Sequence, residues 1–212
     1  GHALRSSLPL FFDSYPAFLL EFGNEWVNLQ SKIIELMKNV AIFVSGSGTN
    51  CENIIKYFEG SNEIRIALVV SNRADAYALV RAKKLGVPAE TVSKSEFGDE
   101  RFIMSKMEEY SIDFIVLAGF LLMVPGFLID AYEKRIINLH PALLPKFGGK
   151  GMYGHHVHEA VKSAGETETG MTVHYVSREC DGGEIIAQFR TPISLDDTPD
   201  EIAAKEHMLE ME

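Results

Sequence analysis

Two polar side chains, Asn138 and His140, stand two residues apart at the end of a short apolar stretch. Arg135-Ile136-Ile137-Asn138-Leu139-His140 starts with β-branched residues and Pro141 follows it, which predicts a strand over residues 135–140. Because side chains alternate across a strand, the amide and the imidazole point the same way. Ligands bind at the carboxyl ends of strands in open α/β sheets. The plain alternative is a polar strand end that meets solvent.

A second candidate for chemistry is Cys180-Asp181-Gly182-Gly183, between two late strands. Its structural interpretation is a β-turn in which Asp181 accepts backbone hydrogen bonds and the glycines take positive φ. Its functional interpretation is a carboxylate that reaches His140, raises the pKa of that imidazole and holds its tautomer. The sequence by itself leaves both open.

A third candidate is the glycine-rich stretch Gly46-Ser47-Gly48-Thr49-Asn50, which joins a predicted buried strand to a predicted helix. Glycine lets the backbone turn sharply, and a helix N-terminus presents unpaired N–H groups to an anion. The third glycine of the dinucleotide fingerprint and the Walker lysine are both absent. A compact phosphate, with added hydrogen bonds from Thr49 and Asn50, therefore fits better than a dinucleotide. A plain tight turn remains the alternative.

Two further patterns have plainer explanations. The apolar run Leu121-Leu122-Met123-Val124 is core by default, and the alternative is the wall of a slot for a flat aromatic ligand. The histidines at 155, 156 and 158 invite a metal hypothesis. They lack the spacing of a zinc site and the His-Glu-x-x-His motif, so we expect no metal.

The elements that must position these residues alternate along the chain. Strands are expected at 39–45, 64–71, 88–92, 113–118 and 135–140, and helices at 51–58, 74–85, 99–110 and 125–132. This alternation predicts a single α/β domain with a doubly wound, mostly parallel, Rossmann-like sheet. After it we expect a loop at 146–153, a helix at 156–164, strands at 171–176 and 184–192, and a helix at 199–212. Candidate caps for the last helix are Asp196, Asp197 and Thr198.

Composition limits the class of protein. The chain has 212 residues, is 46% hydrophobic and carries a net charge of −10, so nucleic-acid and anionic-membrane partners are not expected. Two distant cysteines and no apolar run near the length of about 20 residues that a membrane helix needs favour a cytoplasmic protein. Met37 precedes the first convincing strand, so residues 1–36 are interpreted as a tag or extension and residues 37–212 as the functional domain.

The motifs occur in one order that closely resembles the phosphoribosylglycinamide formyltransferase family, over about residues 37–212. They are Gly46–Asn50, Ser71-Asn72-Arg73-Ala74-Asp75-Ala76, Leu117-Ala118-Gly119-Phe120, Ile137–Pro141 with Leu143-Leu144-Pro145-Lys146, and Asp181-Gly182-Gly183. The resemblance implies transfer of a formyl group from the co-substrate 10-formyltetrahydrofolate to the amino group of phosphoribosylglycinamide in purine biosynthesis. It also implies small-molecule partners, no metal, and a monomer or homodimer.

The resemblance assigns roles to individual residues. It implies catalytic roles for Asn138, His140 and Asp181, and binding of the phosphoribosyl substrate by Gly48, Thr49, Asn50 and Glu210. Folate contacts are implied for Arg101, Leu121, Leu122, Met123, Val124, Asn138, Ser177, Arg178, Glu179, Cys180 and Asp181. It further implies a histidine near the phosphate at His155 and a cis Leu144–Pro145 bond. Family members usually have another segment after the last helix.

The expected mechanism is direct attack of the amine on the formyl carbon. Asn138 and a protonated His140 would stabilise the oxyanion, and Asp181 would accept the amine proton. Two rivals share the Asn-x-His and Asp core: methionyl-tRNA formyltransferase, which should carry a further basic domain, and formyltetrahydrofolate hydrolase, which should carry a regulatory domain in front. A third rival is a non-catalytic phosphate- or nucleotide-binding module, which gives no reason for Asn138, His140 and Asp181 together.

Overall fold

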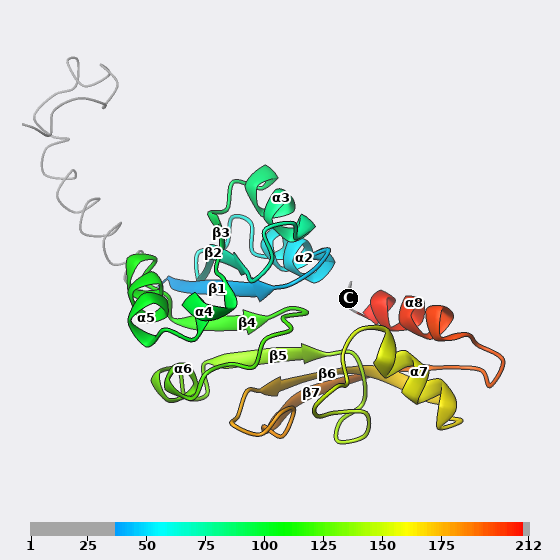
Figure 1. Cartoon of the computed structure of the whole chain (residues 1–212). Coiled ribbons are helices and arrows are strands. Elements are labelled where there is room, and N and C mark those ends of the chain that lie inside the picture. Colours follow the sequence, from blue (N-terminus) through cyan, green and yellow to red (C-terminus); the bar gives the residue numbers. More distant parts are fainter. Residues whose placement is uncertain (1–36, 210–212) are drawn as a thin grey trace, which may run out of the picture. The chain divides into compact units, whose positions relative to one another are not determined.

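A seven-stranded sheet forms the centre of the protein in the computed structural model, which describes residues 37–209 (Figure 1). The strand order is β3-β2-β1-β4-β5-β6-β7. Strands β1 to β5 run parallel, and β6 and β7 extend the sheet in antiparallel pairing. The predicted α/β fold with a mostly parallel sheet is confirmed. The strands are β1 Lys38–Val44, β2 Ile64–Ser71, β3 Ala89–Thr91, β4 Phe114–Leu117, β5 Ile136–His140, β6 Glu168–Tyr175 and β7 Ile185–Pro192.

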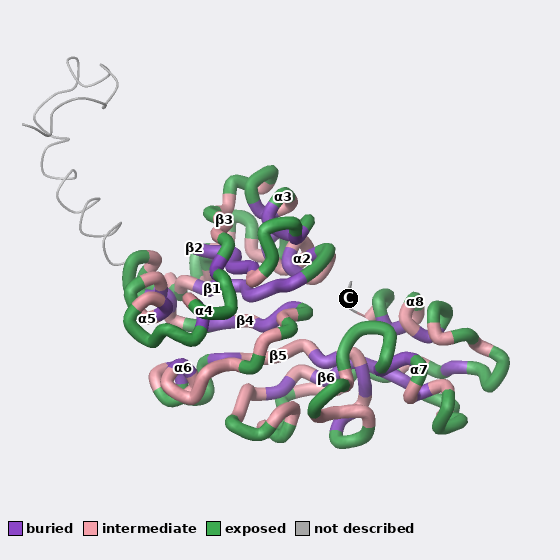
Figure 2. The backbone as a smooth tube through the Cα atoms, viewed as in Figure 1, coloured by how far each residue is buried: buried purple, intermediate pink, exposed green. Residues whose placement is uncertain are grey.

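Helices cover both faces of the parallel part, as expected of a doubly wound sheet. One apolar cluster packs α2 and α3 on side chains such as Ile42 of β1, and another packs α4, α5 and α6 on side chains such as Phe43. Successive residues of β1 thus face opposite layers, and Figure 2 shows most of this strand as buried. The helices are α2 Thr49–Tyr57, α3 Tyr77–Lys84, α4 Lys94–Phe97, α5 Glu100–Glu109, α6 Gly126–Ala131, α7 His155–Ser163 and α8 Pro199–Leu209.

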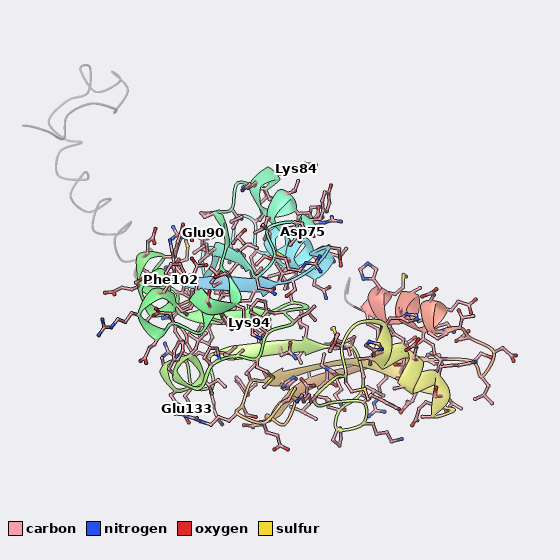
Figure 3. The ribbon with its side chains drawn as sticks, viewed as in Figure 1. Asp75, Lys84, Glu90, Lys94, Phe102 and Glu133 are labelled. Atoms are coloured by element: carbon pink, nitrogen blue, oxygen red, sulfur yellow. The ribbon has the colours of Figure 1, made fainter. Side chains whose placement is uncertain are left out.

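Charged side chains cover the outside of this structure. Lys84 of α3, Lys94 of α4 and Glu133 after α6 are all exposed, and Figure 3 labels these side chains. Within residues 37–209, no helix combines the length and the apolar character that crossing a membrane requires.

The sheet reverses its winding between β1 and β4. The chain leaves β1 for β2 and β3 on one side, then returns to β4 on the other side of β1. The next helix after β1 is α2 and the next after β4 is α6, and they pack on opposite faces. Loops that diverge in this way leave a crevice at the carboxyl edge of a sheet, where ligands bind.

The antiparallel part has a small core of its own. Val157 and Val161 of α7 pack with Ile202 of α8, Ile193 and Ala142. Of the three candidate caps for α8, Thr198 fills the role: its Oγ1 accepts the Glu201 N–H, while the Glu201 carboxylate accepts the Thr198 N–H at 2.8 Å.

Most predicted elements lie within a few residues of the observed ones, with one omission. The short helix α4 was not predicted, although Ser93 and Glu96 have the spacing of a capping box and form one in the structure. The predicted helix at 74–85 begins only at Tyr77. The last three residues of the predicted helix at 199–212 lie outside the described residues.

Candidate active site

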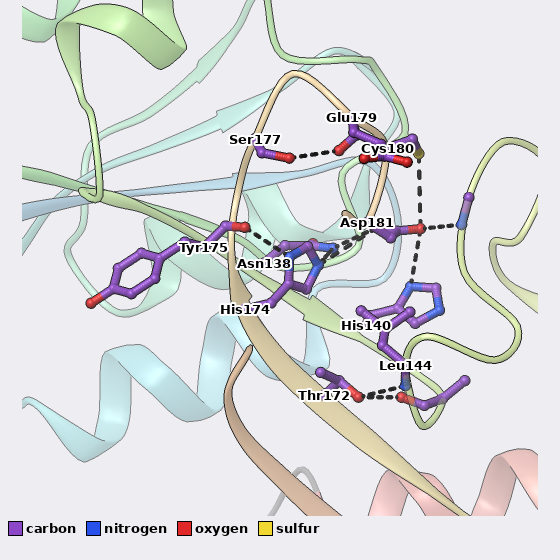
Figure 4. A network of polar contacts seen from close by, with 12 residues as sticks. Asn138, His140, Leu144, Thr172, His174, Tyr175, Ser177, Glu179, Cys180 and Asp181 are labelled. Carbon is purple, nitrogen blue, oxygen red and sulfur yellow. Dashed lines mark hydrogen bonds and ion pairs between the residues drawn. The ribbon is translucent and has the colours of Figure 1, made fainter. Parts of the chain in front are cut away.

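The strand β5 brings Asn138 and His140 to one side of the sheet, beside the loop that follows β6. Asn138 pairs with His174 of β6 in the antiparallel register, so their side chains are neighbours. Asp181, in the β6–β7 loop, lies between them and His140 (Figure 4). Its Oδ2 is 3.7 Å from His140 Nδ1, and its Oδ1 is 3.6 Å from His174 Nε2. Four polar side chains therefore converge at one point.

His140 is buried, and its tautomer is set by a backbone carbonyl. Its Nε2 donates to the Phe147 carbonyl oxygen at 2.8 Å. Because a carbonyl oxygen only accepts, Nε2 carries the hydrogen and Nδ1 is the nitrogen that faces Asp181. Burial lowers the pKa of His140 below its ordinary value, and the opposing effect of the Asp181 carboxylate only partly offsets it.

The predicted effect of Asp181 on His140 therefore needs correction. The carboxylate does reach the imidazole and acts to raise its pKa, as expected. Burial is the larger effect, however, so the net shift is downward and a protonated resting His140 is not supported. The Phe147 carbonyl, rather than Asp181, holds the tautomer.

His174 has the opposite tautomer. Its Nδ1 donates to the Tyr175 carbonyl oxygen at 2.9 Å, and its Nε2 lies 3.1 Å from Asn138 Nδ2. The amide Nδ2 has only hydrogens to offer, so Nε2 of His174 accepts. Asn138 Nδ2 is also 3.5 Å from Asp181 Oδ1. The amide hydrogens of Asn138 are thus directed at His174 and Asp181 in this structure.

Asp181 takes an unusual backbone conformation with φ of 53°, which asparagine and aspartate tolerate better than most residues. The glycines of its turn were expected to have the positive φ, and this prediction is wrong for Gly182 and Gly183. Gly183 is needed for space instead, because a Cβ there would lie 1.7 Å from the Tyr175 carbonyl oxygen.

The charge of Asp181 is stabilised in place. Burial acts to raise the pKa of this carboxyl, but the interaction with His174, the Gly149 N–H and the nearby His140 together hold it below its ordinary value. The Gly149 N–H donates to Oδ2 at 2.9 Å. The histidines stabilise this carboxylate when an imidazole holds a proton on the nitrogen that faces it, so the centre is able to accept a proton.

A buried hydroxyl supports the loop after β5. Thr172 Oγ1 donates to the Ala142 carbonyl oxygen at 2.6 Å and accepts from the Leu144 N–H at 3.1 Å. Gln188 Nε2 donates to the Leu144 carbonyl oxygen at 2.8 Å. The Leu144–Pro145 bond is cis, as the resemblance implied. The hydrogen bonds of Thr172 and Gln188 hold the segment that precedes Phe147. They therefore help to place the Phe147 carbonyl, which sets the tautomer of His140.

A cavity of about 450 Å³ opens beside this polar group. Its wall includes the apolar run from Leu121 to Val124, in which Leu121 and Met123 are 52% and 62% exposed. These two side chains are therefore available to a ligand rather than buried in the core. The predicted residues that line the cavity are Asn50, Leu121, Leu122, Met123, Val124, Asn138, His140, Ser177, Glu179, Cys180 and Asp181.

The glycine-rich loop connects β1 to α2 and packs against α3. Gly48 has φ of 75°, and a Cβ there would lie 2.4 Å from the Ala78 Cβ, so both conformation and space require glycine. The Ala78 N–H donates to the Gly46 carbonyl at 3.2 Å, and Arg81 Nε donates to the Ser47 carbonyl at 3.0 Å. These contacts hold the first N–H groups of α2 at the carboxyl edge of the sheet.

Comparison with known proteins agrees with this arrangement. The sequence profile described as formyl transferase matches residues 38–212, which is most of the chain. The chain belongs to the formyl transferase family. Residues 1–36 lie outside the match to this family.

Several relatives of the chain are named phosphoribosylglycinamide formyltransferase. The phosphoribosylglycinamide formyltransferase of Haemophilus influenzae is 36% identical over 174 residues, which cover 80% of each chain. The chloroplastic enzyme of the same name from Arabidopsis thaliana is 38% identical over 82% of this chain. The match spans only 63% of the length of that plant protein. The crystal structure of phosphoribosylglycinamide formyltransferase from Anaplasma phagocytophilum is 33% identical and superposes with a TM-score of 0.75, covering 82% of both chains.

Several residues expected to act in this formyl transferase lie elsewhere or cannot be placed. Arg101 is exposed on α5 and does not line the cavity. Arg178 is also absent from the lining, and its guanidinium donates to Asp130 on α6 at 2.6 Å. His155 is half exposed, and its Nδ1 lies 3.5 Å from Asp200 Oδ1. Glu210 lies outside the described residues.

The glycine-rich loop contributes unevenly to the cavity. Asn50 lines it, whereas Gly48 and Thr49 are not among the lining residues. Within residues 37–209, no three or more His, Cys, Asp and Glu side chains are arranged to hold a metal ion.

Sequence reasoning missed His174. It lies in a predicted strand, and the tautomer and partners of this side chain follow from the register of β6 against β5. The available signal was the alternation of Thr172 and His174, which places both on one face of β6. The register of β6 against β5 makes this the face of the sheet that carries Asn138 and His140.

Proposed function

We propose that the protein transfers the formyl group of 10-formyltetrahydrofolate to the amino group of phosphoribosylglycinamide. The observation that carries this proposal is the convergence of Asn138, His140 and Asp181 beside a cavity with an apolar wall. The activity named for the family relatives supports it.

The two substrates would occupy different surfaces of the cavity region. The exposed Leu121 and Met123 suit the flat ring system of a folate, because an apolar slot with a few polar groups is the usual form of such a site. The N–H groups at the start of α2, with Gly48, Thr49 and Asn50, suit a phosphate. Glu210 is proposed to contact the glycinamide part of the substrate, as the family resemblance implies.

The chemistry follows from the protonation states. The neutral amine forms a bond to the formyl carbon, and the electron pair of the C=O bond moves to oxygen. The amine proton passes to the centre formed by Asp181 and His140, which is able to accept it. The resulting imidazolium, beside the ionised Asp181, then donates to the oxyanion.

The tetrahedral intermediate collapses when the electron pair on the oxyanion re-forms the C=O bond and the bond from carbon to the folate nitrogen breaks, and that nitrogen takes the proton held by the centre of Asp181 and His140. Asn138 contributes to the oxyanion site only if the ligand displaces one of its present acceptors, His174 or Asp181. No covalent enzyme intermediate is needed in this scheme, and formyl-enzyme trapped by rapid quench would contradict it.

We also propose how the chain is organised in the cell. Residues 37–212 would form the catalytic domain and residues 1–36 an extension, with the family match supporting this boundary. The proposed partners are small molecules, the proposed state is a monomer or homodimer, and the proposed location is the cytoplasm. Two cysteines without a disulfide fit that compartment.

A spectrophotometric assay of a 10-formyl folate tests the activity. We expect release of the deformylated folate only when phosphoribosylglycinamide is present, with equal formation of the formylated amine. Deformylation by water alone would indicate a hydrolase. Binding of the folate without any turnover would contradict the transferase proposal for this chain, and binding of neither substrate would favour the non-catalytic module.

A further inference from the structure

Ser45 is a buried hydroxyl that touches three loops at the carboxyl edge of the sheet. It directly precedes the glycine-rich loop and is 1% exposed. Its Oγ donates to Asn72 Oδ1 at 2.5 Å and accepts from the Leu121 N–H at 2.9 Å. Its own N–H donates to the Gly119 carbonyl oxygen at 3.1 Å. The loops after β1, β2 and β4 therefore meet at this one side chain.

Strand pairing between β1 and β4 ends just before this position, and the backbone bond from the Ser45 N–H to the Gly119 carbonyl oxygen still links the loops after these strands. The strands β1 and β4 are neighbours, but their next helices, α2 and α6, pack on opposite faces, so the loops diverge. The last pair in their register is Phe43 with Leu117, and the loops beyond depend on other contacts. The Ser45 hydroxyl supplies such a contact across the divergence.

Leu121 is the residue through which this contact reaches the cavity. It begins the apolar wall that runs to Val124, and its side chain is 52% exposed. The backbone N–H of Leu121 is fixed by Ser45, so the hydroxyl sets where the apolar wall starts.

We propose that Ser45 is a positioning residue for the folate slot, acting through the Leu121 amide although Ser45 itself does not line the cavity. This inference rests on the proposed function for the identity of the ligand, but not for the contact. Without the hydroxyl, the Leu121 N–H loses its partner and the wall is free to shift. The loss of one hydrogen bond predicts a dissociation constant for a folate analogue about 5- to 10-fold higher.

Ser71 provides a matched control. It is a fully buried serine that ends β2, opposite Val44, and its Oγ accepts the Arg73 N–H at 3.2 Å within its own loop. Replacing either serine with alanine removes the same group from the same edge of the sheet. Only the Ser45 hydroxyl reaches the cavity wall.

The test uses the full chain and two measurements on wild type, Ser45→Ala and Ser71→Ala. Amide hydrogen exchange by NMR, without ligand, should show faster exchange at Leu121 in Ser45→Ala only. Calorimetric titration with a folate analogue that lacks the formyl group should show weaker binding in Ser45→Ala, and a change of less than about twofold in Ser71→Ala. Thermal unfolding shows that each variant is folded.

The outcomes separate the inference from the proposed function. If wild type and Ser45→Ala bind the analogue with equal affinity, the inference is overturned and the proposed function stands. An equal loss in Ser71→Ala would also overturn it, because general loosening of the edge would then be the cause. If wild type binds no folate, the proposed function is contradicted. If Leu121 exchange nevertheless depends on Ser45, the hydroxyl only anchors the loop and does not position a folate slot.

Discussion

Two groups of histidines and carboxylates in this protein differ in how closely they are paired. His158 Nδ1 of α7 lies 2.9 Å from Glu206 Oε2 of α8, a contact without hydrogen-bond geometry, and Thr169 Oγ1 donates to the other carboxylate oxygen. Around Asp181, the imidazole nitrogens of His140 and His174 remain 3.7 and 3.6 Å away. We call the first group closed because its atoms are in contact, although His158 also lines the cavity, and the second group open because its wider spacing leaves room for a transferred proton.

The difference indicates separate uses of the same residue types. A buried carboxylate in a closed pair holds two helices and a strand together, and its removal leaves partners without compensation. An open group costs stability but keeps acceptor atoms beside the cavity. The structure thus separates a contact for folding from a centre for chemistry.

The largest expected effect follows from Asp181→Asn, which removes the charge of the open group. Asparagine tolerates the positive φ at this position, so the fold should be retained. We expect turnover to fall by about 10²–10⁴-fold, the usual contribution of an acid–base group. Steady-state kinetics at saturating substrates measures this, with the exposed Asp130→Asn as control. Turnover within threefold of wild type would remove Asp181 from the mechanism.

Substitution in the closed group should lower the stability of the fold, whereas substitution in the open group lowers turnover. Glu206→Ala leaves His158 and Thr169 without their carboxylate, and we expect the free energy of unfolding to fall by about 2–3 kcal/mol. The matched control is Glu159→Ala on α7, whose carboxylate is half exposed and lies 3.5 Å from His155 and His156. Its expected change is under about 0.5 kcal/mol. Denaturant unfolding compares the two, and equal losses would refute the distinction.

The smallest expected effect concerns pH. Because burial lowers the pKa of His140, the free enzyme keeps this imidazole neutral until the pH falls below its ordinary value of about 6.5. We therefore expect kcat/KM to be constant from pH 8 to about 6.5 and to decline only at lower pH. The stability contribution has the same sign: it is present above the unfolded pKa and is lost as pH falls, since the unfolded chain takes up the proton first. An acid limb centred above pH 7 would contradict the shift.

Much of the site could be predicted because it depends on local pattern. The alternation of side chains placed Asn138 and His140 together, and the glycines marked the loop before α2. The pairing of His174 with Asn138 required the register of β6 against β5, which no local pattern contains. The sign of the His140 shift required its depth of burial, and the Asp181 turn used its glycines for space rather than for φ.

The position of the Arg178 side chain could not be predicted from local sequence pattern either. Arg178 follows β6 in sequence as the folate assignment required, but its long side chain turns to Asp130 on α6. Only the folded arrangement of α6 beside that loop makes this partner available. The same holds for Glu206, a charged residue whose burial depends on Thr169 and His158 arriving from β6 and α7.

The most direct test of the open centre is the tautomer of its two histidines. Long-range ¹⁵N–¹H NMR spectra of the ligand-free protein at pH 7 distinguish hydrogen on Nδ1, on Nε2 or on both. The structure predicts hydrogen on Nε2 of His140 and on Nδ1 of His174, so that both bare nitrogens face Asp181. A doubly protonated His140 at that pH would contradict a centre that accepts the proton of the substrate.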